Sequence, residues 1–226
     1  MNHQKDIYHL YLASDLYRLL ALAFDAPSKQ QFETIETLLD DIGHEVHQPD
    51  IAQCLQDLQR AAKAESATVE AEYNRLFVNQ VLCPPCEGSY HLAERGPILG
   101  DITAFYRAFS LETVEQQGPP DSIRMELGYM SFMALKRISA LEGRDDDAAD
   151  ITKVATMRFL MDHLGRWGFL FADRLLASTT HMFYQTSAKL LKVWFECEMK
   201  FYDLSPHPLP LKLLSFEDEE SVQCHL

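Results

Sequence analysis

The sequence predicts an all-α protein, a single globular domain of about eight or nine helices. Apolar residues recur with the period of an α-helix along nearly the whole chain, and no useful length alternates as a β-strand does. Glycine is scarce for a turn-rich β fold, with nine among 226 residues. The chain is 47% apolar and 24% charged, which is ordinary for a soluble globular protein with one substantial core.

The first third of the chain should form helices at residues 6–24, 28–42, 51–65 and 67–79. The first of them carries two apolar stripes, which predicts burial on more than one side. Pro27 ends it, because the residue before a proline avoids the helical conformation. Ser28 is the expected cap of the second helix, which should close at Gly43, and Asp50 is the expected cap of the third.

A long irregular stretch, residues 79–100, follows and contains three prolines and three glycines. A connection of this length in a compact domain is more often functional than accidental. The helices expected after it cover residues 101–110, 122–141, 147–164, 167–178 and 181–203. Asp101 should cap the first of these, and Asp121 or Ser122 the second, while "GRWG" should separate the third from the fourth. Residues 206–226 should form an extended or mobile tail outside the helical domain of residues 1–205, with Leu209 to Phe216 packing on the body.

Charge and targeting signals narrow the class of partner. The net charge is −14 and no basic run stands out, so nucleic acid is a poor partner and a basic partner is favoured, although acidity also serves solubility alone. The chain opens without a signal peptide and has no apolar run long enough to span a membrane. Five cysteines, three of them scattered, do not make a disulfide framework. The expected compartment is the cytoplasm.

The stretch "CPPCEGSY" at residues 83–90 allows three interpretations. Cys83 and Cys86 could hold a metal or an iron–sulfur cluster, form a redox disulfide, or only shape a turn. A closed metal site needs four ligands, and Cys54, His91, Cys197, Cys224 and His225 could complete one, but none stands at a recognised spacing. The two prolines disfavour the helix that follows a thioredoxin-like motif. The turn is therefore the favoured reading, and no cofactor is expected.

No sequence motif supports an enzyme, since no nucleophile or acid–base pair can be named. Two proline-rich loops, around Pro84–Pro85 and Pro119–Pro120, stand instead beside apolar, aromatic and acidic residues. If these loops meet, they form a groove with an apolar floor and an acidic rim. Such a groove could receive a peptide that carries basic residues and a hydrophobic stretch, although the same residues could also only pack the loops onto the core.

At these residues the sequence resembles the TorD/DmsD/NarJ family of redox-enzyme maturation chaperones. The matching elements are "EYNRLF" at 72–77, "PPCEGSY" at 84–90, "PDSIRMELGYM" at 120–130 and "DHLGRW" at 162–167, in the family's order. The resemblance implies an all-helical protein without catalytic activity. It implies binding to the catalytic subunit of a molybdopterin oxidoreductase of the dimethyl-sulfoxide-reductase type, and to its twin-arginine signal peptide, until the cofactor is inserted.

The resemblance also implies a set of residues that bind the client peptide. They are Tyr73, Leu76, Phe77, Pro84, Pro85, Glu87, Tyr90, Pro120, Asp121 and Glu126. Several of them could serve only to hold the fold. Two positions depart from the family pattern, because Ser122 stands where the family has histidine and Cys86 stands where it has an aromatic residue. The rival hypothesis is a small metal- or iron–sulfur-binding protein that uses Cys83 and Cys86.

Overall fold

The computed structural model describes residues 3–65, 67–92, 94–112 and 118–210. The α-helices are α1 (His3–Ala23), α2 (Lys29–Glu45), α3 (Pro49–Glu65), α4 (Val69–Tyr73), α5 (Arg95–Ala108), α6 (Ile123–Glu142), α7 (Asp146–Phe159), α8 (Gly165–Ser178) and α9 (Met182–Tyr202). Two π-helical segments, η1 (Asn74–Asn79) and η4 (Leu160–Leu164), and a 3₁₀ turn, η2 (Glu87–Ser89), complete them. The all-α prediction is confirmed, since these ranges contain one isolated β-bridge and no β-strand.

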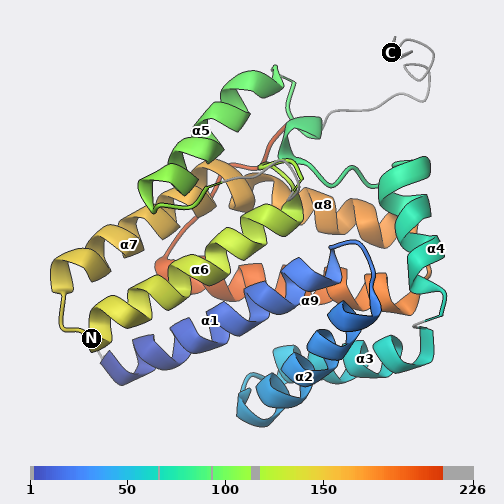
Figure 1. The fold of residues 1–226 in the computed structure, drawn as a ribbon, viewed down its shortest axis with the longest axis horizontal. Coiled ribbons are helices and arrows are strands. Elements are labelled where there is room, and N and C mark those ends of the chain that lie inside the picture. Colours follow the sequence, from blue (N-terminus) through green and yellow to red (C-terminus); the bar gives the residue numbers. More distant parts are fainter. Residues whose placement is uncertain (1–2, 66, 93, 113–117, 211–226) are drawn as a thin grey trace.

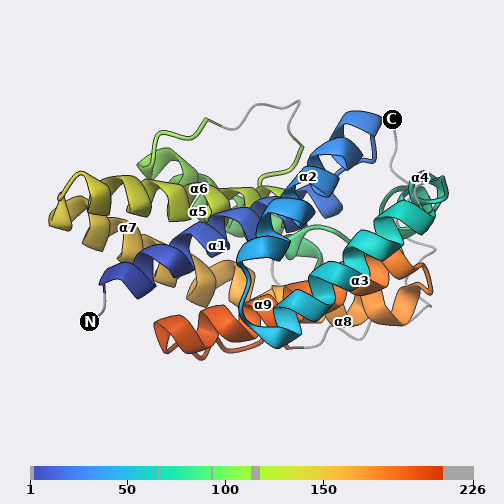
Figure 2. The same cartoon turned by 90° about the horizontal axis from the view of Figure 1, so that it is seen from below.

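Helices α1 and α6 form the central pair of the molecule. They run side by side in opposite directions, and α7 packs on α6 (Figure 1). Helix α2 packs on α1, and α3 lies beside α2 (Figure 2), while α9 packs against both α3 and α8. The ends of α1 and α6 that carry residues 23 and 123 are therefore near the irregular segment between α4 and α5.

The core agrees with the expected burial of the first helix on several sides. Leu10 and Tyr17 lie on one side of α1 and Leu12 and Leu19 on the opposite side, and all four are buried. Trp167 of α8 and Trp194 of α9 are the largest fully buried side chains among the described residues. Burial of this apolar surface is the main source of the fold's stability.

Two helix starts follow directly from capping chemistry. The Ser28 hydroxyl accepts a hydrogen bond from the Gln31 amide at 3.2 Å, and the Gln31 side chain accepts one from the Ser28 amide at 2.9 Å, which is a capping box. The Ser122 hydroxyl accepts a hydrogen bond from the Met125 amide at 3.4 Å and caps α6. Both serines were expected as caps.

Three other expected helix ends are wrong. Helix α2 runs through Gly43 to Glu45, because a glycine can continue a helix as well as end it. Helix α3 begins at Pro49, whose fixed φ suits the first helical position, so Asp50 lies inside the first turn. Helix α5 begins at Arg95, so Asp101 lies within the helix and does not cap it.

The expected break at "GRWG" is also wrong. Helix α7, η4 and α8 follow one another without a loop from Asp146 to Ser178. A Cβ at Gly168 would lie 2.2 Å from Phe195 Cε2, and one at Gly165 would lie 2.3 Å from the Leu160 carbonyl oxygen. These glycines allow close packing and do not interrupt the helix.

The chain after α9 returns toward α8 as far as residue 210. Leu209 is buried, and its amide donates a hydrogen bond to the Arg166 carbonyl oxygen at 3.2 Å. The remainder of the expected tail lies outside the described residues, so the division at residues 205 and 206 stays a prediction. None of the described helices combines the length and the apolar character needed to cross a membrane.

Candidate functional site

The two proline loops are in direct contact. We call residues 84–90 the first corner and residues 119–126 the second corner. The Glu87 amide donates a hydrogen bond to the Asp121 carbonyl oxygen at 2.8 Å, and the Ile123 amide donates one to the Pro85 carbonyl oxygen at 2.8 Å. These bonds flank the bridge between Cys86 and Ser122. Backbone pairing thus fixes the two corners together before any side chain is considered.

Asp121 fastens the corners to α5 through its buried carboxylate. Arg95 donates two hydrogen bonds to it, from Nε to Oδ2 at 2.8 Å and from Nη2 to Oδ1 at 2.5 Å. The Gly88 amide donates a third, to Oδ2 at 3.1 Å. A Cβ at Gly88 would lie 2.5 Å from Arg95 Cγ, so the approach of the arginine requires a residue without a side chain. The Asp121 side chain is fully shielded from solvent, while that of Arg95 is 45% exposed.

Glu87 joins the first corner to two histidines. Its Oε1 lies 2.8 Å from His91 Nε2, and its Oε2 lies 3.0 Å from His163 Nδ1. The other ring nitrogen of His163 lies 3.1 Å from Asp101 Oδ2. His163 comes from η4, so this chain of contacts links the first corner, η4 and α5. It also gives the family element "DHLGRW" a structural role.

Glu126 is the third buried acid. Trp167 Nε1 donates a hydrogen bond to its Oε2 at 3.0 Å. Burial, and then the charge of the nearby Glu87, raise the pKa of Glu126 well above its usual value. Burial beside Glu87 therefore favours the protonated, neutral form of the Glu126 carboxyl group. Glu87, Asp121 and Glu126 all have 0% exposure. Their carboxyl groups bond to residues inside the protein and do not form an acidic rim.

The remaining candidate residues, which are apolar or aromatic, fall into a buried group and a half-buried group. Leu76, Phe77 and Tyr90 are buried, and the Tyr90 hydroxyl donates a hydrogen bond to the Pro84 carbonyl oxygen at 3.0 Å. Four candidates are half-buried and reach solvent: Tyr73, Pro84, Pro85 and Pro120. Of the ten sequence-predicted residues, only these four can touch a partner in this conformation. The assignment of the ten to client binding stays a prediction.

The two cysteines of the first corner are free thiols that favour the protonated form. Cys83 is buried, and its Sγ lies 3.6 Å from the Phe171 carbonyl oxygen. Burial raises the pKa of both Cys83 and Cys86 to about 12, with the charge of Asp121 adding to the effect at Cys86. Within the part of the chain that the structure describes, no three histidine, cysteine or acidic side chains are arranged to hold a metal ion.

Sequence reasoning missed the residues that complete these contacts. Arg95 was placed in an irregular stretch, and His163 and Trp167 were noted only as parts of a motif. The signal was present in the motif spacing, because residues 163 and 167 are one helical turn apart and face the same side. Sequence reasoning also missed the pocket between α1 and α6. A glycine within a helix, Gly128, lines this pocket and was the signal that the sequence offered.

The fold and the corners define a helical protein in which the buried acids of the two corners bond to other residues of the same chain. Residues 25–173 match the model of the family described as the nitrate reductase delta subunit. The chain therefore belongs to the nitrate reductase delta subunit family. The resemblance found in the sequence is confirmed at this level, while a closer relation to TorD or DmsD stays a prediction.

A solved structure has a similar fold. It is the crystal structure of an Archaeoglobus fulgidus protein assigned provisionally to the redox enzyme maturation proteins. The two chains are 20% identical with a TM-score of 0.57, over 81% of this chain and 93% of the other. At this identity the likeness shows the fold alone. Comparison with curated protein sequences gives no match.

Proposed function

We propose that this protein is a maturation chaperone, not an enzyme, which binds the catalytic subunit of a molybdopterin oxidoreductase before its cofactor is inserted. The observation that carries the proposal is the family match over residues 25–173. The architecture supports it, because the polar groups at the corners are engaged in holding the fold. Asp121 is bound by Arg95, and Glu126 is bound by Trp167.

The proposal includes a cationic segment of the client, such as a twin-arginine signal peptide of an enzyme of the dimethyl-sulfoxide-reductase type. The net charge of −14 supports this choice, since an acidic surface attracts arginines at long range. The work would take place in the cytoplasm, where a client awaiting export is still accessible. Release would follow when cofactor loading buries the surface that the chaperone contacts.

A pull-down with purified components tests the proposal. The tagged chain should retain a cofactor-free catalytic subunit of a molybdopterin oxidoreductase from the same genome, and should retain the cofactor-loaded subunit much more weakly. A cofactor-free subunit from an unrelated molybdoenzyme family controls for capture of any unfolded protein. Equal retention of all three, or of none, would remove the proposal.

A further inference from the structure

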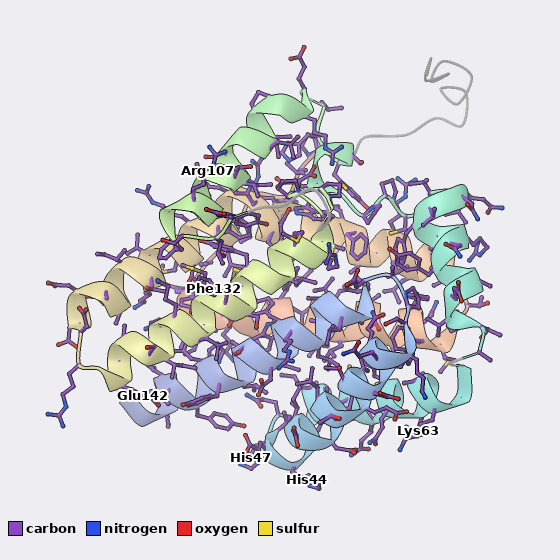
Figure 3. All side chains as sticks on the ribbon, viewed as in Figure 1. His44, His47, Lys63, Arg107, Phe132 and Glu142 are labelled. Carbon is purple, nitrogen blue, oxygen red and sulfur yellow. The ribbon has the colours of Figure 1, made fainter. Side chains whose placement is uncertain are left out.

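An apolar pocket of about 350 Å³ opens between α1 and α6, next to the second corner. We call it the α1–α6 pocket. Its apolar lining comes from Ala21, Leu22, Leu111, Met125, Tyr129 and Phe132. Phe132 lies on α6 on the side toward the end of α5 (Figure 3), and the Lys136 ammonium lies 5.7 Å from its ring centroid. The pocket is large enough for one or two apolar side chains of a partner.

Gly128 lines this pocket. It is exposed on α6, and a Cβ built there would meet no atom within 4 Å. Glycine within a helix costs about 1 kcal/mol relative to alanine. At Gly165 and Gly168 packing explains the glycine, because a Cβ would collide with neighbouring atoms. At Gly43, Gly96, Gly100 and Gly128 a Cβ would meet no atom within 4 Å, and of these four glycines Gly128 lines the pocket.

A polar, acidic cleft of about 420 Å³ adjoins the pocket. We call it the α2 cleft, and its lining consists of Arg18, Gln30, Glu33, Thr34, Thr37, Leu38 and Asp41. Arg18 also lines the α1–α6 pocket, so the two hollows share a wall. The lining of the cleft contains two acids, Glu33 and Asp41, and one base, Arg18, so it carries an excess of negative charge.

The charges that face the two hollows favour a cationic occupant. Arg124 is balanced by Asp25, with Nε and Oδ1 3.3 Å apart. Arg18 remains among the lining residues to face Glu112, Glu33 and Asp41, and Lys136 adds one positive charge beside Phe132. Lys29 offsets Glu33 only weakly, because that pair is 3.7 Å apart and exposed. A second copy of this chain, with its own net charge of −14, would be repelled from this surface.

We propose that the α1–α6 pocket and the α2 cleft form one docking surface for a cationic amphipathic segment of the client. An apolar side chain of the segment enters the pocket beside Gly128, and basic side chains lie over the cleft near Asp41. This inference rests on the proposed chaperone function and specifies where the client binds. It places the contact beside the second corner and along α1 and α2, and the buried acids Asp121 and Glu126 do not line it.

Two substitutions test the two halves of the surface, each with a matched control. Gly128→Leu adds a side chain at the lining of the pocket, where a Cβ would meet no atom within 4 Å, and Gly100→Leu makes the same change at an exposed, open position of α5. Asp41→Lys reverses a charge that faces the cleft, and Glu36→Lys makes the corresponding change on another face of α2. All four positions are exposed and helical, so the folded state should survive, as circular dichroism would check.

The affinity of each variant is measured with the cofactor-free catalytic subunit and with synthetic peptides, by isothermal titration calorimetry. We expect Gly128→Leu and Asp41→Lys each to weaken binding about tenfold or more, and the controls to change it less than about twofold. A peptide with two arginines before a leucine-rich run should bind the wild type. Its versions with glutamates for the arginines, or serines for the leucines, should bind at least about tenfold more weakly.

The outcomes separate this inference from the proposed function. If the subunit binds the wild type and all four variants equally, the docking surface is wrong while the chaperone function stands. If the glutamate peptide binds as well as the arginine peptide, charge does not select the occupant and the inference fails. If no catalytic subunit binds the wild type, the proposed function itself fails.

Discussion

The contact between Asp121 and Arg95 makes a quantitative prediction about the fold. Asp121→Ala removes three hydrogen bonds, two from Arg95 and one from the Gly88 amide. The Arg95 side chain is 45% exposed, so water replaces most of what its guanidinium loses, and that part contributes only about 1 kcal/mol. The Gly88 amide loses its acceptor in a half-buried place, which costs about 1–2 kcal/mol.

The expected loss in the free energy of unfolding is therefore about 2–3 kcal/mol. For a chain of 226 residues this lowers the melting temperature by roughly 4–12 °C. Urea unfolding followed by tryptophan fluorescence is a suitable assay, since Trp167 and Trp194 are both fully buried in the native state. Arg95→Ala and the double variant complete a cycle, whose coupling energy should be about 1 kcal/mol.

The same variants distinguish a structural role of Asp121 from direct contact with a client. A structural residue lowers stability first, and its effect on binding disappears when binding is measured well below the melting temperature. A residue that touches the client lowers affinity at unchanged stability. A cost below about 0.5 kcal/mol for Asp121→Ala, together with lost client binding, would refute the reasoning from burial.

Three further predictions follow from buried groups. The pKa of Glu126 is raised in the folded chain, so the folded chain holds a proton that the unfolded chain releases above about pH 4.5, and native stability falls as the pH rises from there. Glu126→Gln should remove this dependence, whose slope is up to about 1.4 kcal/mol per pH unit. Urea titrations at several pH values measure it. Gly168→Ala should cost about 1–3 kcal/mol against Phe195, whereas Gly128→Ala should stabilise by up to about 1 kcal/mol, as thermal unfolding will report. Cys83 and Cys86 should resist maleimide labelling at pH 7 until urea unfolds the chain, because burial raises both thiol pKa values to about 12; mass mapping of labelled peptides checks this.

Local chemistry accounts for the parts of the fold that the sequence predicts well. Ser28 and Ser122 cap helices through bonds to residues three positions later, and such bonds need no tertiary context. The apolar period along α1 is equally local. The failures lie where distant residues decide the outcome. Gly168 reads as a break in isolation, but Phe195 of α9 makes it a packing position.

The candidate site shows the same division. The sequence places two proline corners near acids and aromatics, and their contact follows the expectation. What it does not reveal is which side chains the contact buries, because Arg95 and His163 come from segments whose register is set only in the folded chain. The partners then turn an expected acidic rim into an internal network. The acidic side chains of a motif that suggested a binding surface thus have their hydrogen-bond partners inside the protein.

Burial of charged groups at the corners has a consequence for how the family motif is interpreted. A buried ion pair adds little net stability, because desolvation of both partners offsets their attraction, but removal of either partner is costly. Such a pair therefore selects one arrangement of α5 and the two corners, and it adds little to the stability of that arrangement. Asp121 satisfies this description, since its buried carboxylate bonds to Arg95 at the start of α5. A motif that specifies the arrangement of the corners also places the start of α6, and with it Met125 and Gly128, against α1. Asp121 would then influence client binding by shaping the α1–α6 pocket, without contacting the client itself.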